Sequence, residues 1–420
     1  MEKRKTGHLS EKKSTKQLIL DAAFSFYRRP WVQEFSMSQL AAKVGISKTA
    51  IYRHFKNREA VLEAMKDYFF DVLFTQLVKI HEKNYQEDIF DKRAEDFIIF
   101  FTNNSQYINY IVTQHSEMPN FEKIVNDELQ SRGYFSNFDD VAEEKFLKTE
   151  LKKYTFVYFY SVSIIFFIKL RERILLQNKT EMAVSNVEEF AKKLVDFLHK
   201  GLGEVIKERF KIDKISPERM AELDKLCKIN ESDLPEENRI FTAFANVIRK
   251  TGFGSVTVES IAKELNMAKS SLYFYFDNKR EMLVSLVSKE LSFLEMACVE
   301  NRAEAKTYPE YIYINMKTAL SYFCARPSIL SLCGYLIQSG SNRDLENGDC
   351  IIEVNSGWEV WLREVLKNFD LGFPVCPEFF TLWTGILTVG LIILRIKHKF
   401  TEEETDKALK YVFDLVMHGV

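Results

Sequence analysis

The sequence contains few of the residues that interrupt helices, with 15 glycines and 8 prolines among 420 residues. Because these are the two poorest helix formers, their scarcity beside long periodic apolar stretches predicts an almost wholly helical, all-α chain. Apolar residues make up 46% and charged residues 28%, the composition of an ordinary soluble globular protein. The length allows two or three domains, each with its own core.

Paired cysteine motifs are missing as well. The six cysteines include no C-x-x-C motif, and their spacing offers no framework for disulfides or for zinc. We therefore expect reduced thiols in a cytoplasmic protein. The N-terminal segment MEKRKTGHLSEKKSTK is charged and lacks an apolar core, so we do not expect it to be a signal peptide.

An excess of charge of one sign is also lacking, since 58 basic and 60 acidic side chains leave a net charge of −2. The net charge therefore indicates no nucleic-acid partner, although a chain with this net charge can still carry a local basic patch. No Ser/His/Asp set, paired-carboxylate spacing, glycine-rich phosphate loop or metal-ligand spacing is recognisable. We expect no enzyme activity, no cofactor and no metal.

Apolar runs long enough to cross a membrane are absent too. The two longest, residues 154–168 and 379–394, fall short of the roughly 20 residues that a membrane helix needs. Lysines and arginines flank both runs closely. We expect two buried interface helices and no membrane partner.

An internal repeat is present. Residues 36–65 align without a gap with residues 257–286, at an offset of 221 residues. Each copy later contains one of the two apolar runs, followed by an amphipathic segment at 187–203 or 402–420. So long a period indicates a duplicated domain and not a solenoid. Identical pairs within the aligned segment are Ala41/Ala262, Lys48/Lys269, Tyr52/Tyr273, Phe55/Phe276, Asn57/Asn278 and Leu62/Leu283.

The repeated unit is predicted to begin with three short helices and a longer fourth. Ser36 and Thr257 are the expected N-caps of the second helix. Gly45 and Asn266 occupy the following turn, and these two residue types best tolerate a left-handed backbone. The small Ala41 lets the second and third helices cross closely, which is typical of a helix-turn-helix. Outward positions on the third helix of copy one hold Lys48, Thr49, Tyr52, Arg53 and His54, a set suited to phosphates and base edges.

These motifs resemble the tetracycline-repressor (TetR) family. Copy one carries Ala22-Ala23…Phe26, Ser36…Leu40-Ala41, Tyr52-Arg53-His54-Phe55 and Arg58-Glu59…Leu62. Copy two carries Ala243, Thr257…Ile261-Ala262, Tyr273-Phe274-Tyr275-Phe276 and Lys279…Leu283. The resemblance implies two tandem TetR-like units, each a helix-turn-helix DNA-binding domain plus a helical ligand-sensing and dimerisation domain. The expected domains are 1–66 with a basic arm, 67–203, a linker at 204–236, 237–286 and 287–420.

The resemblance also implies site residues. DNA contacts are expected from Ser36, Lys48, Thr49, Tyr52, Arg53, His54 and Arg58 in copy one, and from Thr257, Lys269, Ser270, Tyr273, Tyr275 and Lys279 in copy two. Aromatic residues at helical spacing are more often core, but they could line a pocket for an unknown small apolar or aromatic ligand. The candidates for such ligand contacts are Phe97, Phe101, Tyr107, Tyr110, Tyr322, Phe323 and Trp383.

The two copies differ in ways that leave two hypotheses open. Tyr275 replaces the family's histidine, Phe274 replaces Arg53, and residues 1–66 hold 14 basic and 6 acidic side chains against 8 and 8 in residues 228–286. The first hypothesis is a monomeric, single-chain pseudo-dimeric repressor that binds a double-stranded DNA operator, in which helices within 154–203 pack against helices within 379–420. The alternative is a helical sensor or interaction protein whose second helix-turn-helix no longer binds DNA and serves in dimerisation. The alternative assembly is a homodimer.

Overall fold

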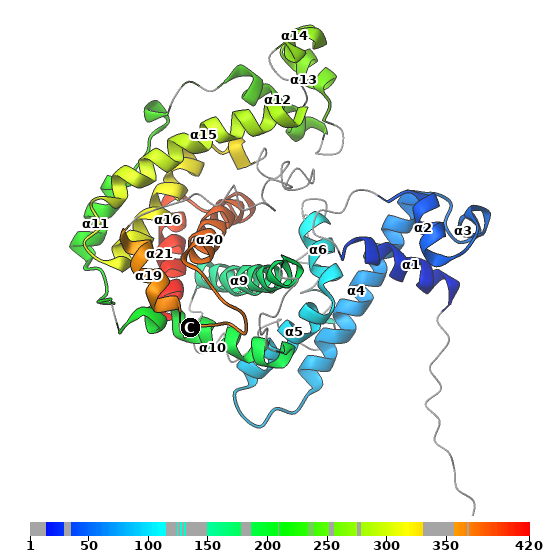
Figure 1. The fold of residues 1–420 in the computed structure, drawn as a ribbon, viewed down its shortest axis with the longest axis horizontal. Helices are drawn as coiled ribbons and strands as arrows, with labels where there is room; N and C mark the ends of the chain where they lie inside the picture. Colours follow the sequence, from blue (N-terminus) through cyan, green and yellow to red (C-terminus); the bar gives the residue numbers. More distant parts are fainter. Residues whose placement is uncertain are drawn as a thin grey trace, which may run out of the picture. The chain divides into compact units, whose positions relative to one another are not determined.

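Figure 1 shows the fold as a computed structural model. It describes residues 14–28, 35–114, 124, 127, 130–131, 149–177, 186–208, 210–234, 236, 238–251, 256–274, 279–330, 357–367 and 369–420. Within these residues the regular structure is helical, with one isolated β-bridge between Asp370 and Pro374. Internal contacts divide the chain into unit 1, residues 1–84 and 103–137, and unit 2, residues 85–102 and 138–420.

Unit 1 contains the first helix-turn-helix and the long helix that follows it. Its core forms where α1 contacts α4 and α6, and aromatic rings dominate this contact. The ring of Phe24 lies 5.1 Å from the rings of both Tyr107 and Tyr110, in edge-on geometry. The helices of unit 1 are α1 (Thr15–Phe26), α2 (Met37–Val44), α3 (Lys48–His54), α4 (Arg58–Glu82) and α6 (Ser105–Gln114).

Unit 2 brings the late helices of the two sequence copies together. Helix α9 contacts α20 and α21, and α10 contacts α21 and α19. The buried indole of Trp383 donates to the Ser163 hydroxyl at 2.9 Å, and the Tyr158 hydroxyl donates to the Leu387 carbonyl at the same distance. These helices are α9 (Glu150–Gln177), α10 (Val187–Ile206), α19 (Gly357–Leu366), α20 (Pro377–His398) and α21 (Glu402–His418), preceded in the chain by α5 (Ile89–Asn103).

Two glycines allow α10 and α21 to approach within backbone contact. Gly201 and Gly419 both have positive φ angles, 72° and 73°. A Cβ atom on Gly201 would lie 2.5 Å from the backbone nitrogen of Gly419, and one on Gly419 would overlap the carbonyl oxygen of His199. The Val420 N–H donates to that carbonyl at 3.2 Å. Only glycine satisfies both the backbone angles and the spacing at these two positions.

The early helices of copy two also belong to unit 2. Helices α15 and α16 pack together through a buried polar contact. The Arg326 guanidinium donates to the Glu290 carboxylate at 2.7 Å, and the Tyr322 hydroxyl donates to the Glu290 carbonyl oxygen at 3.1 Å. The helices are α12 (Arg239–Thr251), α13 (Val258–Glu264), α14 (Lys269–Tyr273), α15 (Lys279–Arg302) and α16 (Tyr308–Ala325).

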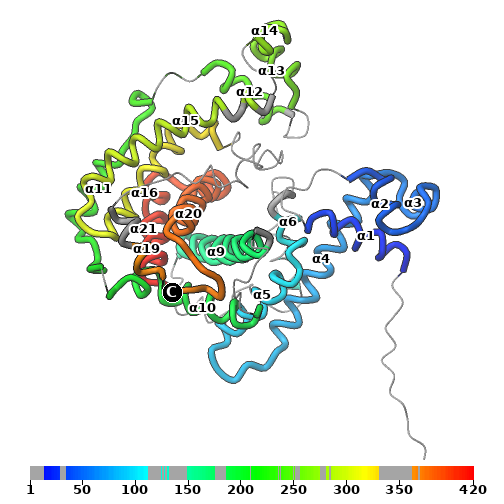
Figure 2. Tube along the Cα trace, in the orientation of Figure 1, coloured from blue at the N-terminus to red at the C-terminus, as the bar shows by residue number. Residues whose placement is uncertain are grey.

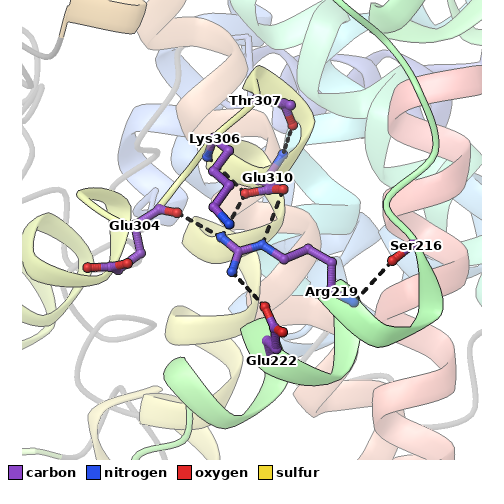
Figure 3. Close-up of polar contacts among 7 residues, drawn as sticks. All are labelled: Ser216, Arg219, Glu222, Glu304, Lys306, Thr307 and Glu310. Atoms are coloured by element: carbon purple, nitrogen blue, oxygen red, sulfur yellow. Dashed lines mark hydrogen bonds and ion pairs between the residues drawn. The ribbon is translucent and has the colours of Figure 1, made fainter.

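The segment expected as a linker folds and docks on copy two. Figure 2 follows it from α10 through α11 (Pro217–Leu226) to α12, with a short 3-10 turn at Glu231–Asp233. Arg219 on α11 forms an ion pair with the buried carboxylate of Glu310 on α16 at 3.0 Å (Figure 3). The same guanidinium donates to the Glu304 carbonyl and to the Glu222 carboxylate. The joining segment is thus anchored at a defined place.

The two apolar runs lie in α9 and α20. By length and composition both helices could cross a membrane, yet half of the most apolar window of each is buried inside the protein. Their contacts with each other and with α21, those of α20 with α16 and α19, and those of α9 with α10 account for that burial. Helices of this kind occur in the cores of soluble proteins, so they are weak evidence for a membrane span.

Candidate nucleic-acid interface

In copy one the sequence builds a helix-turn-helix from two caps and a glycine. The Ser36 hydroxyl accepts from the Gln39 N–H at 3.2 Å while the Gln39 side chain accepts from the Ser36 N–H at 2.8 Å, a complete capping box. Gly45 then has a φ of 78°, in the left-handed region. Ser47 caps α3 by accepting from the Ala50 N–H. The cap and turn predicted from the sequence are confirmed.

Helix α3 has one buried and one exposed face. Ile51 is fully buried and Phe55, just after the helix, is 4% exposed, so these two side chains fix the helix against the core. The opposite face presents hydroxyl, ammonium, guanidinium and imidazole groups, which can donate to phosphate oxygens and base edges. The exposed residues on this face are Lys48, Thr49, Tyr52, Arg53 and His54.

Arg58 lies apart from this exposed face, at the start of α4. Its Nε–H donates to the Phe35 carbonyl at 3.2 Å, and its guanidinium lies 5.6 Å from the centre of the Phe35 ring. These contacts join the start of α4 to the entry of α2. The side chain therefore supports the helix-turn-helix, and a contact with DNA stays a prediction for this residue.

Copy two repeats the backbone but changes the surface. Thr257 and Ser260 form the capping box, and Asn266 has a φ of 53°, so it meets the steric demand that Gly45 meets in copy one, as predicted. At the start of α14, Ala268 replaces the capping Ser47 and provides no side-chain hydrogen bond. The exposed residues of α14 and its C-cap are Lys269, Ser270, Tyr273 and Phe274.

Phe274 is a surface feature that the site prediction missed. Its side chain is 84% exposed, although it is apolar, and it stands where copy one has the exposed Arg53. The alignment of the two copies at an offset of 221 residues places Phe274 at the position of Arg53 and could have identified it. Tyr275 lies outside the residues that the structure describes, as does the side chain of Lys279, so the predictions for these two positions stay predictions.

Six of the seven aromatic residues predicted as ligand contacts are buried in the described structure, and Phe97 is half-buried. In unit 1, Tyr107 and Tyr110 pack on Phe24, and Tyr110 also lies 5.4 Å from the ring of Phe69. These contacts connect α6 to α1, the first helix of the first helix-turn-helix head. Both side chains are at most 8% exposed.

The remaining aromatic candidates belong to α5, α16 and α20. Phe97 and Phe101 pack on each other with ring centres 4.6 Å apart. Tyr322 and Phe323 are buried on α16, and Trp383 packs among the rings of α9, α10 and α20. Direct ligand contact by any of them stays a prediction.

The described cysteines have thiols that burial makes less acidic. Burial raises the pKa of Cys227 to about 11 and the pKa of Cys298 and Cys376 to about 12. These thiols are therefore protonated at neutral pH and are poor nucleophiles. Among the described residues, no group of three or more His, Cys, Asp or Glu side chains is placed to hold a metal ion.

Comparison with known families matches the two helix-turn-helix segments. The model of the family described as bacterial regulatory proteins, tetR family, matches at residues 19–65 and again at 240–286. An uncharacterized HTH-type transcriptional regulator of Haemophilus influenzae is 28% identical over 101 residues, which are 24% of this chain and 53% of that protein. The nucleoid occlusion factor SlmA of Photobacterium profundum is 30% identical over 102 residues, 24% of this chain and 48% of that protein.

Further matches have the same limited extent. The uncharacterized HTH-type transcriptional regulator YuxN of Bacillus subtilis is 31% identical over 71 residues, 17% of this chain and 24% of that protein. The chain thus spans between a quarter and about half the length of these curated relatives. Among solved structures, a TetR family transcription regulator from Marinobacter aquaeolei VT8 matches with a TM-score of 0.32 and 15% identity, over 47% of this chain and 97% of that one.

The fold and the capped turns define a helical protein with two helix-turn-helix heads. Both heads match the same family model, so the chain carries two TetR-type helix-turn-helix domains in tandem. The matched curated proteins are named as HTH-type transcriptional regulators and as a nucleoid occlusion factor. The first head keeps the exposed basic and hydroxyl groups, while the second presents a more apolar surface.

Proposed function

We propose that this protein is a cytoplasmic, ligand-responsive transcriptional repressor whose two TetR-like units form a pseudo-dimer within one chain. The observation that supports this most strongly is the packing of α9 and α10 against α20 and α21. These are the corresponding late helices of the two sequence copies. In the TetR family, which the chain resembles, two chains pair through their last two helices.

The direction of the contacts supports a two-fold relation between the copies. Along α9, the ring of Tyr154 stacks on that of His398 at 4.1 Å, and further along α9 the Ser163 hydroxyl accepts from Trp383, nearer the start of α20. The two helices therefore run in opposite directions. Equivalent elements related by a two-fold axis meet each other in this manner.

The glycine contact supports the same relation. Gly201 lies at a kink near the end of the segment 187–203, Gly419 is the C-cap of α21 near the end of 402–420, and the two glycines contact each other. Left apart, α9, α10, α20 and α21 would expose apolar surfaces larger than the few hundred Å² usual on soluble monomers. Pairing within one chain makes the association intramolecular, at effective concentrations near millimolar for suitable linkers.

In this proposal both heads contact one operator. Lys48, Tyr52 and His54 bind phosphates, and Lys48 and Thr49, near the start of α3, reach base edges. In copy two, Lys269, Ser270 and Tyr273 occupy the equivalent surface. An effector of apolar or aromatic character, bound by the helical sensor domains, changes the separation of the heads and releases the DNA.

A gel-shift assay with fragments of the source genome tests the proposal. We expect retention of specific fragments in the presence of excess nonspecific competitor DNA, and weaker binding as salt rises. Loss of all binding under competition would contradict a sequence-specific regulator.

The second candidate function is a helical sensor or interaction protein in which only the first head binds DNA. The 84% exposure of Phe274, in place of Arg53, favours it. Footprinting of a retained fragment distinguishes the two functions. Protection of two neighbouring major-groove segments supports two active heads, whereas one protected segment supports the alternative.

A further inference from the structure

A polar pocket lies beside the linker helix α11, and no residue of α14 lines it. Its volume is about 230 Å³, below the roughly 300–1,000 Å³ of pockets for drug-sized ligands. Residues from the linker segment, α16, α20 and α21 line it together. The linker helix α11 precedes the segment of copy two that matches the family model. Because α11 supplies part of the lining, the pocket is not a feature that the two copies share.

Two ion-pair networks hold α11 in place and so fix the walls of the pocket. At its start Arg219 pairs with Glu310 (Figure 3), whose carboxylate also accepts from the Lys306 N–H at 2.9 Å. Near its end the Asp224 carboxylate accepts from the Tyr313 hydroxyl and from the Lys410 ammonium. The pocket is therefore part of a docked arrangement of helices.

The segment after α11 is fixed as well. Cys227 is fully buried, and the Ile229 N–H donates to the Ser321 hydroxyl on α16 at 2.7 Å. Lys225 and Lys228, which line the pocket, therefore extend from backbone that is held on both sides.

Acidic groups in the pocket do not balance its basic groups. Asp406 pairs with Lys317 at 2.6 Å, and Asp224 is occupied by Tyr313 and Lys410. Apart from these pairs, the lining holds three cationic side chains, those of Lys225, Lys228 and Arg395. It holds one further acidic side chain, that of Glu402.

The partner of Arg395 is unusual for a guanidinium. Its Nη1 donates to the sulfur of Cys324 at 3.1 Å. Burial raises the pKa of that thiol, so the sulfur is a neutral and weak acceptor. A guanidinium gains much more from a carboxylate or phosphate, which it can bind through two parallel hydrogen bonds.

We propose that this pocket binds a small multivalent anion carrying carboxylate or phosphate groups. Lys225, Lys228 and Arg395 supply the positive charge and the hydrogen-bond donors. The pocket lies on α20 and α21, the helices that contact α9 and α10, so an anion bound there acts on the contact between the two copies. This regulatory consequence rests on the proposed repressor function, whereas the binding itself does not.

Isothermal titration of the full chain with citrate and, separately, inorganic phosphate tests the site, with sodium chloride at matched ionic strength as the blank. We expect saturable binding of at least one of the two anions. Citrate binding alone would identify a carboxylate ligand and phosphate binding alone a phosphate ligand. The absence of saturable heat with both would overturn the proposal.

Variants locate the binding. Lys228→Gln and Arg395→Gln should each weaken the affinity roughly tenfold, because each removes a charge-assisted hydrogen bond. The matched control is Lys407→Gln on α21, an exposed lysine outside the pocket that pairs with Glu403. The assignment would be overturned if Lys228→Gln, at an exposed position, and Arg395→Gln both kept the wild-type affinity for the anion. It would also be overturned if Lys407→Gln lost as much affinity as they do.

A gel shift in the presence of the bound anion separates the two proposals. Anion binding by a chain that retains no DNA would leave the pocket assigned and contradict the repressor function. Anion binding that leaves DNA affinity unchanged would contradict the regulatory consequence alone.

Discussion

At the scale of single residues, the reading surface of copy one depends on hydroxyl and ammonium groups that α3 holds outward. Tyr52 is 44% exposed although the neighbouring Ile51 is fully buried. An aromatic ring at such a position has its hydroxyl available to a phosphate. Lys48 lies one turn earlier on the same face.

Tyr52→Phe should weaken DNA binding by about 1 kcal/mol, roughly fivefold, on every sequence tested, because a phosphate contact carries no base information. Lys48→Ala should also weaken binding and lower the salt dependence by about one released counterion. Gel shifts at several salt concentrations measure both effects, with Lys192→Ala on α10 as control. Wild-type affinity in both variants would remove Tyr52 and Lys48 from the interface.

The glycines of the α10–α21 contact make a second prediction at this scale. Gly419→Ala should destabilise the chain by on the order of 2 kcal/mol, since the residue has a positive φ and its Cβ would overlap the His199 carbonyl oxygen. Gly385→Ala on α20 is the matched control, because a Cβ there meets nothing within 4 Å. That substitution should stabilise by about 0.5–1 kcal/mol. Urea unfolding monitored by circular dichroism measures both, and equal effects of the two would contradict the close approach.

At the scale of helices, the docking of α11 depends on an ionised Glu310. Burial alone would raise the pKa of this carboxyl, but the hydrogen bonds from Arg219 and from the Lys306 N–H outweigh it, so the pKa lies below its ordinary value of 4.5. A carboxyl with a lowered pKa in the folded state contributes stability above its unfolded pKa, and this stability is lost as the pH falls through the folded value.

The stability difference between the wild type and Glu310→Gln should therefore be largest near pH 7 and should shrink as the pH falls below about 4.5. Thermal melting at a series of pH values measures the difference. Glu222→Gln serves as the control. Because Glu222 is an exposed partner of the same arginine, this variant should lower the stability less than Glu310→Gln does. A difference that does not change with pH would show that the Glu310 carboxylate is not the stabilising species.

The sequence predicted the elements that depend on local chemistry. The caps at Ser36 and Thr257 and the left-handed turns at Gly45 and Asn266 follow from residue types within a few positions of each other, so no distant partner had to be known. The long apolar helices were likewise evident as runs of apolar residues.

The docking of α11 and the position of Arg58 could not be predicted from residue types at neighbouring positions. Glu310 lies 91 residues after Arg219, and the composition of the segment around α11 is that of an exposed linker. The aromatic residues were ambiguous for a related reason. A core ring and a ligand-contacting ring have the same helical spacing, and only the ring contacts of Tyr110 and Trp383 show that other side chains surround them.

At the scale of the whole molecule, the contacts of α9 and α10 with α20 and α21 are available within one chain. We therefore expect a monomer of about 49.2 kDa at micromolar concentration. Multi-angle light scattering coupled to size exclusion measures the mass directly. A stable species of twice that mass would mean that these helices pair between chains.

The two heads should also select different half-sites. The exposed groups of α3 are basic and hydroxylic, whereas α14 presents Tyr273 and Phe274 beside a single lysine. Because different side chains favour different base edges, the preferred operator should be asymmetric or only loosely palindromic. Selection from a random DNA library tests this, and recovery of a perfect palindrome would indicate two copy-one heads from separate chains.

The contact between α10 and α21 also changes what a single mutation can do. In a homodimer, every substitution in a reading helix appears in both subunits, so both half-sites change together and the operator stays symmetric. When the two halves belong to one chain, a substitution in α14 leaves α3 as it was. The sequence of each head can then change independently of the other. The difference between Ser47, which caps α3, and Ala268, which provides no side-chain cap for α14, is a change of this kind.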